Sequence, residues 1–321
     1  MKLASGSSIY DKSRHTQRQR IYGGEALRIF PEHPDVANRM SRHVFDNAVN
    51  KLGCDRTMQV KQVKYGIYTW FGYVRPFEER LRMIKDAGFD SICTWWGDTF
   101  FSMDGKKELH AELAAKHDLV LEHAHLPYHG YDALWTNSLN GTSLAATCCK
   151  SIAAAANCGI RNLVMHPYEN KRAVQNGDWQ AFFYYMDSFA DTADRYGIRL
   201  AIENLDECRI VKRILKKYKE SAPIGLCFDT GHGNINEPGD FSLLMENRDR
   251  VYALHLHDNN GKTDQHLLPF EGSVNWGLFM QQLNKTPFLY PFIWSFPLCV
   301  SKLRKSSLLI ISTASICEFM L

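Results

Sequence analysis

The feature of this sequence that most limits its fold is a regular alternation of short apolar runs and longer stretches of helical character, beginning near residue 63. The short runs are rich in β-branched and aromatic residues, whereas a stretch such as Pro76 to Ala87 repeats its apolar residues at helical spacing. We expect seven strands, at residues 64–70, 89–95, 119–125, 160–166, 198–204, 224–230 and 251–257. Gly88, Gly159 and Gly197 precede three of them, where the C-terminus of a helix favours glycine. The alternation therefore predicts repeated βα units.

Repeated βα units build a parallel sheet, which is either doubly wound or closed into a barrel. A doubly wound sheet that binds dinucleotides carries a G-x-G-x-x-G turn after its first strand, and the segment TWFGYVRP at residues 69–76 lacks that motif. The sequence therefore favours an α/β fold of the (β/α)8 TIM-barrel type.

The overall composition is that of a globular protein, with 45% hydrophobic and 23% charged residues. The sequence has no run of about 18 apolar residues, so we expect no membrane span. It also has no apolar signal-type segment near its start, so we expect a cytoplasmic protein. Its nine cysteines are scattered and form no C-x-x-C pair, which predicts reduced thiols and no disulfide framework or thiolate zinc site.

The net charge of +3 is located at the two ends of the chain. Residues 1–57 carry ten Lys and Arg against six Asp and Glu, and residues 285–321 carry four against one. Residues 58–284 therefore have a net charge of −4. A mildly acidic middle part is a poor binder of nucleic acid, so no nucleic-acid partner is favoured.

We divide the chain into an N-terminal basic extension (1–62), a barrel (63–284) and an atypical C-terminal segment (285–321). The extension is expected to be partly disordered or to form a short helix at about Pro34 to Leu52. A partner-binding arm, or read-through sequence before an ordinary start at Met58, are the other interpretations of this extension.

Polar residues occur where five of the expected strands end, namely His125, His166, Glu203, Asp229 and His255. The carboxyl ends of barrel strands form one face, where active sites of such barrels are built. Carboxylate and imidazole groups together suit a divalent metal such as Mn²⁺, Mg²⁺, Co²⁺ or Zn²⁺. Each residue alone could be a structural hydrogen-bonding group. His123 and His257 share faces with His125 and His255, so the period of two leaves open which of each pair faces the metal.

Four motifs surround these residues: VMHP (164–167), IENLD (202–206), FDTGH (228–232) and HLHDNNGKTDQHLLPFEG (255–272). They resemble motifs of the xylose isomerase-like barrel superfamily of sugar-phosphate isomerases and epimerases. The resemblance covers about residues 63–284. The same superfamily includes ketose 3-epimerases, inosose dehydratases and DNA-repair enzymes of the endonuclease IV type.

The resemblance implies that Glu203, Asp229 and His255 bind the metal, with His257 as the alternative third ligand. It also implies that His232 contacts the substrate or, in the nuclease branch, a further zinc ion. Additional metal or substrate contacts are implied for His125, His166, His257, Asp264 and His266. Several ions are compatible with this set, and we favour the single ion that is more common among the sugar enzymes.

The chemistry implied for such a site is removal of a proton next to a carbonyl group through a metal-stabilised enediolate. Glu203 would take the proton, and His232 is the second catalytic candidate. The expected partner is a small sugar or sugar phosphate, as in carbohydrate metabolism, and a homo-oligomer is compatible with the sequence. Trp70, Trp95 and Trp96 could stack on the sugar ring or could equally pack within the barrel.

The pattern breaks after Asn284, because residues 285–321 contain no Gly, no Asp and one acidic residue, Glu318. The resemblance implies an eighth strand that ends in a second catalytic glutamate, but residues 288–298 contain prolines and no carboxylate. We therefore expect an aberrant or incomplete eighth βα unit. A frame change or misplaced stop, a natural variant that uses Glu318 or another donor, and an inactive barrel are the three explanations.

Two alternatives to an isomerase or epimerase follow from these observations. An endonuclease IV-like zinc-dependent nuclease is suggested by the histidines and by the Asp264/His266 pair, and the acidic middle part counts against it. A catalytically inactive barrel is suggested by the missing glutamate of the eighth strand.

Overall fold

The computed structural model describes residues 64–71, 74–218, 223–286 and 292–294. The helix expected at about Pro34 to Leu52 and the acidic residue Glu318 lie outside these residues, as does most of the atypical C-terminal segment.

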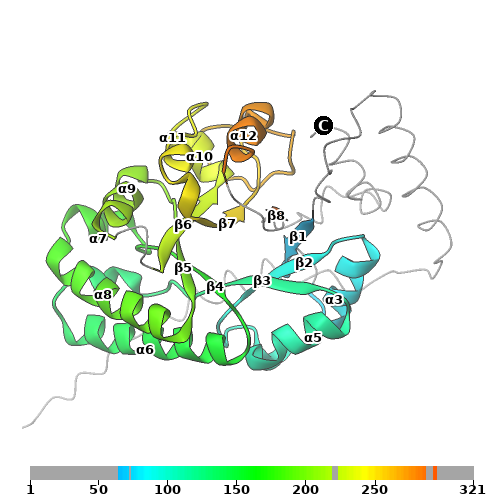
Figure 1. The fold of residues 1–321 in the computed structure, drawn as a ribbon, viewed down its shortest axis with the longest axis horizontal. Helices are drawn as coiled ribbons and strands as arrows, with labels where there is room; N and C mark the ends of the chain where they lie inside the picture. The colour runs from blue at the N-terminus through cyan, green and yellow to red at the C-terminus, as the bar shows by residue number, and fades with distance from the viewer. Residues whose placement is uncertain (1–63, 72–73, 219–222, 287–291, 295–321) are drawn as a thin grey trace, which may run out of the picture. The chain divides into compact units, whose positions relative to one another are not determined.

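The strands form one parallel sheet in the order β7-β6-β5-β4-β3-β2-β1-β8, and the sheet curls as it proceeds (Figure 1). The bounds are β1 Tyr65–Tyr68, β2 Ser91–Trp95, β3 Val120–His125, β4 Asn162–Met165, β5 Arg199–Glu203, β6 Ile224–Asp229, β7 Val251–His255 and β8 Phe292–Trp294. The first seven confirm the strands expected from the sequence. The sequence-based fold class, a TIM-barrel type with an incomplete eighth unit, is confirmed.

The eighth strand is shorter than the others and is bounded by prolines in the sequence. It has three residues, Phe292–Trp294, and pairs in parallel with β1. Among the described residues it has no hydrogen-bonded pairing with β7. Pro291 and Pro297 flank it, and because proline cannot donate to a sheet, a strand in this place stays short.

Helices cover the outer side of the curled sheet, among them α3, α5, α6, α8 and α9 (Figure 1). The α-helices are α3 Phe77–Asp86, α4 Phe101–Asp104, α5 His110–Lys116, α6 Leu139–Asn157, α7 Lys171–Gln175, α8 Trp179–Tyr196, α9 Cys208–Lys217, α10 Thr230–Asn236, α11 Ser242–Glu246 and α12 Trp276–Leu283. Three short 3₁₀ segments are η1 Lys107–Leu109, η2 Tyr131–Trp135 and η3 Arg248–Arg250. None of the helices in the described part of the chain is long and apolar enough to span a membrane.

The predicted glycine positions after helices are confirmed by the backbone. Gly88, Gly159 and Gly197 have φ angles of 89°, 83° and 66°, in the region that favours glycine. Each ends a helix and turns the chain directly into β2, β4 or β5. These turns return each strand to the same direction, which a parallel sheet requires.

Small side chains from four neighbouring strands pack on the inner face of the curled sheet. Val164, Ala201, Cys227 and Ala253 form a buried cluster of their own, separate from the large core between sheet and helices. Because every second side chain of a strand lies on the same face, the next inward side chain lies two residues further along, at the carboxyl end of the strand. On β4 to β7 those next residues are His166, Glu203, Asp229 and His255. The alternation of side chains therefore places four polar residues at the carboxyl end of the sheet, next to this small apolar cluster.

Two register shifts interrupt the regular alternation. Next to β2, Ile92 pairs with Leu121 and Cys93 with His123, so Glu122 is an extra residue in β3. A similar shift makes Tyr252 the extra residue in β7. Since a bulge lets two successive residues approach the same side of a sheet, Glu122 lies beside His123 in the buried interior.

Candidate active site

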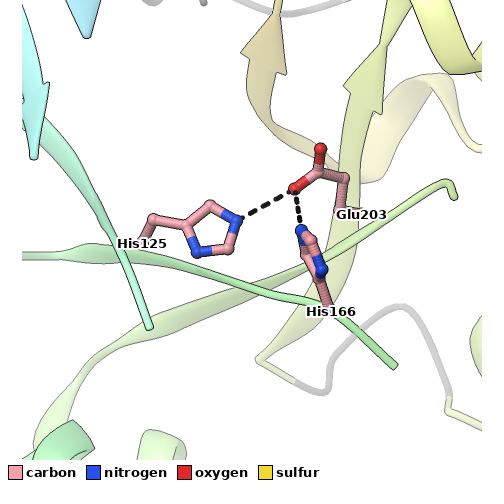
Figure 2. Close-up of side chains that lie close together, drawn as sticks. All are labelled: His125, His166 and Glu203. Atoms are coloured by element: carbon pink, nitrogen blue, oxygen red, sulfur yellow. Dashed lines mark hydrogen bonds and ion pairs between the residues drawn. The ribbon is translucent and has the colours of Figure 1, made fainter. Parts of the chain in front are cut away.

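Three of the expected residues meet at the ends of β3, β4 and β5 (Figure 2). The Nε2 atoms of His125 and His166 lie 3.1 Å and 3.2 Å from the same oxygen, Oε2 of Glu203. Glu203 is only 3% exposed, so its charge is almost fully removed from solvent. The three residues offer ligand atoms within 4.8 Å of one another.

The other oxygen of Glu203 faces β7. Its Oε1 atom lies 3.0 Å from Nδ1 of His255, and Nε2 of His255 lies 3.2 Å from Nε2 of His123. Cys227 completes a group with Glu203 and His255 whose ligand atoms lie within 4.8 Å. Sequence reasoning missed Cys227, although its position two residues before Asp229 marks it as inward-facing. Burial raises the pKa of its thiol well above the usual range, so the group is protonated.

A second centre forms around Asp229. Its Oδ1 atom lies 2.9 Å from Nε2 of His257 and 3.6 Å from Nδ1 of His232. Asp229 also caps helix α10 by accepting the backbone N–H of His232 at 2.8 Å. Gly231 makes this packing feasible, because a Cβ atom there would lie 1.9 Å from Cε1 of His257. The D-T-G-H sequence thus supplies a potential metal ligand and helix cap in Asp229, room for the ring of His257 at Gly231, and a further imidazole in His232.

The loop after β7 brings Asp264 and His266 to the same place. Asp264 Oδ2 lies 3.4 Å from Nε2 of His232 and 3.2 Å from Nε2 of His266. Its Oδ1 lies 3.6 Å from Nε2 of His257, on whose ring His266 stacks at 3.9 Å. The buried carboxylate of Asp258 fixes this loop by accepting hydrogen bonds from the backbone further along.

Both members of each histidine pair therefore lie among these groups. His255 faces Glu203, while His257 faces Asp229. On β3, His125 faces Glu203 and His123 reaches His255. The alternation of strand residues made both members of each pair candidates, and the spatial arrangement gives each a different neighbour.

Charges in this centre depend strongly on one another. Burial alone would raise the pKa of Glu203, but the neighbouring charge of His255 and hydrogen bonds from His125 and His166 hold it well below its usual range. Burial lowers the pKa of His166 to about 4, so its ring is neutral. Burial also opposes charge on His232, but the adjacent carboxylates of Asp229 and Asp264 raise its pKa to about 10. Hydrogen bonds and electrostatic attraction between carboxylates and imidazoles stabilise this centre.

The donor set fits a divalent ion. Four groups of three ligand atoms adjoin one another: His125/His166/Glu203, Glu203/Cys227/His255, Asp229/His232/His257 and His257/Asp264/His266. They combine imidazole nitrogens with carboxylate oxygens, which hard and borderline divalent ions prefer. Each group offers three ligand atoms for one ion, and the expected ligands Glu203, Asp229 and His255 are divided between two neighbouring groups.

The three tryptophans differ in position. Trp95 stacks on the ring of His125, with ring centres 5.6 Å apart. Trp96 is 1% exposed and belongs to the hydrophobic core. The indole of Trp70 donates to Asp104 at 3.0 Å and lies under the guanidinium of Arg80. Trp95 is thus the one of the three that adjoins the histidine centre, while Trp96 has the packing role.

A pocket of about 850 Å³ opens beside this centre. Its lining includes three residues of the histidine centre, His166, His232 and Asp264. Further hydrogen-bonding side chains line its walls, namely Tyr128, Tyr168, Asp206, Asn236, Lys171 and Arg172. Tyr128 stacks on His166 with ring centres 4.2 Å apart. Most of its lining residues carry a polar group, and the pocket is large enough for a small organic molecule.

Comparison with known proteins agrees with the fold. The family described as xylose isomerase-like TIM barrel matches residues 81–297. Two curated relatives are similar over part of their length: y4fM of Sinorhizobium fredii, 29% identical over 48% of this chain and 52% of that protein, and MJ1311 of Methanocaldococcus jannaschii, 30% identical over 32% and 38%. Both are uncharacterized proteins. The chain spans about half or less of the length of these relatives.

The similar solved structures include sugar epimerases. A D-tagatose 3-epimerase-like protein has a TM-score of 0.64 and 20% identity, over 80% of this chain and 97% of that one. A D-allulose 3-epimerase from Methylomonas sp., in complex with D-allulose, has a TM-score of 0.61 and 17% identity, over 81% and 98%. A D-psicose 3-epimerase in the presence of D-fructose has a TM-score of 0.62 and 16% identity, over 80% and 98%.

Proposed function

Because this chain belongs to the xylose isomerase-like TIM-barrel family, we propose that it is a metal-dependent sugar isomerase or epimerase. The observation that carries the proposal is Glu203, a buried carboxylate surrounded by imidazoles at the carboxyl end of the sheet. Beside it lies a pocket of about 850 Å³, a volume suited to a small sugar, and most residues that line this pocket carry a polar group.

Glu203 and His255 would hold the metal from one group of ligand atoms and Asp229 from the neighbouring group, with His257, at hydrogen-bond distance from Asp229, as the alternative third ligand. When bound, a divalent ion polarises a carbonyl group and stabilises negative charge that develops beside it. The chain's own residues then need to orient the sugar, exclude water and move a proton.

Glu203 is the base that we assign to the proton next to the carbonyl. Neighbouring charges keep its pKa low, so it is ionised and able to accept a proton. His232 lines the pocket and carries a proton on its ring, which suits contact with a sugar hydroxyl or oxygen. Tyr128 and Asn236 offer further hydrogen bonds to hydroxyl groups along the pocket wall.

Epimerisation needs a second group that returns the proton from the opposite face. Residues 288–298 contain no carboxylate, so β8 does not supply one. A mechanism limited to Glu203 and His232 is compatible with isomerisation or exchange of one proton, and a dehydratase reaction would begin with the same step. Mass analysis of products separates loss of water from a change of configuration.

Metal content tests the site directly. We expect the purified chain to bind Mn²⁺ or Co²⁺, and we expect Glu203→Ala and Asp229→Ala each to lose most of that metal. Glu169→Gln is the matched control, because this carboxylate lines the same pocket but bonds to Gly130 and His129 instead of the histidine centre. Equal metal in the wild type and in both alanine variants would overturn the assignment.

A zinc-dependent nuclease is a second candidate, and one observation favours it. Asp264 and His266 lie against His232 and His257, so ligand atoms exist for more than one ion. Three zinc ions per chain together with cleavage at abasic sites would support the nuclease over the sugar enzyme. A metal-loaded chain that cleaves no abasic site counts against it.

A further inference from the structure

A line of four buried side chains crosses the interior of the sheet from β3 to β5. Glu122 contacts Nδ1 of His123, whose Nε2 lies 3.2 Å from Nε2 of His255. Nδ1 of His255 in turn lies 3.0 Å from Oε1 of Glu203. Glu122 and His123 are 6% and 0% exposed, so water does not compete with these contacts.

The direction of the hydrogen bonds in this line follows from what each atom can donate. An ionised carboxylate only accepts, so Nδ1 of His123 carries the proton that faces Glu122. Full burial disfavours a second proton on His123, and its Nε2 is then an acceptor. That acceptor requires a proton on Nε2 of His255, so an ion that displaces a proton from His255 takes the place of the one on Nδ1, the atom that faces Glu203.

Asn162 holds Glu122, the residue at the end of the line away from Glu203. Its Nδ2 group donates to Oε1 of Glu122 at 2.9 Å and to the backbone oxygen of Glu122 at 3.2 Å. An amide N–H group only donates, so this oxygen of Glu122 remains an acceptor. The bulge in β3 puts Glu122 within reach of both Asn162 and His123.

We propose that Glu122 and His123 are positioning residues that hold His255 with its Nδ1 lone pair free for the metal beside Glu203. This role rests on the proposed function, because it concerns the same metal site. Hydrogen bonds of this kind to a ligating histidine fix its tautomer and ring orientation. Glu203 and His255 belong to one group of potential ligands, and their Oε1 and Nδ1 atoms lie 3.0 Å apart, close enough to bind one ion together.

The substitution Glu122→Gln tests which atoms donate and which accept in the hydrogen bonds along this line. Asn162 still needs an acceptor, so the amide oxygen of the new side chain stays on Asn162 and its NH₂ group faces His123. His123 then accepts at Nδ1 and donates at Nε2, which puts the proton of His255 on Nδ1, where the metal should bind. We expect affinity for Zn²⁺ to fall about 10- to 100-fold.

Asn162 provides the matched control. In Asn162→Ala the carboxylate of Glu122 still accepts from His123, so we expect Zn²⁺ affinity near that of the wild type. In the double variant Glu122→Gln/Asn162→Ala the new amide is free to turn its oxygen to His123. We expect the double variant to recover part of the affinity that Glu122→Gln loses, which a merely structural defect would not allow.

Nitrogen NMR of histidine-labelled, Zn²⁺-loaded wild type gives a readout that needs no substitution in the line. We expect the His255 signal, assigned by its loss in His255→Ala, to show a proton on Nε2 and the metal on Nδ1. Zinc on Nε2 of His255, or unchanged Zn²⁺ affinity in Glu122→Gln, overturns the positioning role and leaves the proposed function intact. A wild-type chain that binds no Zn²⁺, Mn²⁺ or Co²⁺ overturns both.

Discussion

Gly231 shows at the scale of one residue how tightly the histidine centre is packed. A Cβ atom at this position would lie 1.9 Å from Cε1 and 2.4 Å from Nδ1 of His257. His257 is fully buried and contacts Asp229, so the ring cannot move without disturbing a potential ligand. The glycine of the D-T-G-H sequence is therefore required by its neighbour, not by an unusual backbone angle.

Gly231→Ala should destabilise the fold by about 1–3 kcal/mol, as overpacking of a core does, and should also reduce metal binding. Urea unfolding and metal analysis measure the two effects. Gly277→Ala is the control, since a Cβ at this position in α12 has its nearest neighbour at 3.7 Å, an ordinary contact. Equal stability and equal metal content in the two alanine variants would contradict the packing argument.

The strand-end residues could be predicted from the sequence because β-strands alternate their side chains with a strict period of two. Glu203 and Asp229 follow that rule, and both face the interior. Glu122 could not be predicted, since the bulge that turns it inward depends on the register between β2 and β3. The role of Trp96 was also open, because the strand pattern does not tell a core aromatic residue from one beside the pocket.

At the scale of elements, a buried polar network joins the loops after β1 and β2. Arg80 of α3 is fully buried, pairs with Asp104 of α4 and donates to the backbone oxygen of Thr69 at 2.6 Å. His110 of α5 accepts from Thr94 at 3.1 Å and donates to the backbone oxygen of Asp104 at 3.1 Å. The network links α3, α4 and α5 to the carboxyl ends of β1 and β2.

His110 makes the stability of these elements depend on pH. Burial lowers its pKa below the value in the unfolded chain, which is about 6.5. As pH falls below about 6.5, the unfolded chain takes up this proton first, so the free energy of unfolding decreases until the folded-state pKa is passed. Above about pH 6.5 the ring is neutral in both states and contributes no pH dependence.

In His110→Gln the amide can donate to the Asp104 oxygen and accept from Thr94 without titrating. We expect the variant to lose less stability than the wild type between pH 7 and pH 5, by up to about 1.4 kcal/mol per pH unit. Urea unfolding at several pH values measures this difference. Parallel curves for the two proteins would mean that His110 titrates equally in the folded and unfolded chain.

The eighth strand illustrates what an element's sequence can and cannot predict. Its prolines and lack of a carboxylate correctly predicted an incomplete unit. That Phe292–Trp294 still pairs with β1 could not be predicted from this segment alone. The pairing comes from the partner strand, since β1 would otherwise leave its outer edge unpaired in the described sheet.

At the scale of the whole molecule, the candidate metal centre connects strands that are far apart in the sequence. Glu203 of β5 contacts His125 of β3 and His255 of β7, and Asp229 of β6 contacts His257. An ion bound to the folded chain alone stabilises it by mass action. Loss of the ion should therefore lower the free energy of unfolding of the whole sheet.

Removal of metal by EDTA should lower the melting temperature. With free metal at about 100 times its dissociation constant, the loss is about 2.7 kcal/mol, or roughly 5–10 °C for a domain of this size. Glu203→Ala should not respond to EDTA, and Glu169→Gln should respond like the wild type. Differential scanning calorimetry measures the three shifts, and an EDTA effect equal in all three proteins would place the bound ion elsewhere.

We propose that this molecule removes a proton next to the carbonyl group of a sugar. Incubation of the Mn²⁺- or Co²⁺-loaded chain with a panel of ketoses and inososes in D₂O, followed by mass analysis, measures this step directly. We predict deuterium at the carbon next to the carbonyl of at least one sugar, and none with Glu203→Gln. A chain that holds its metal but exchanges no proton in any of these sugars would contradict the claim.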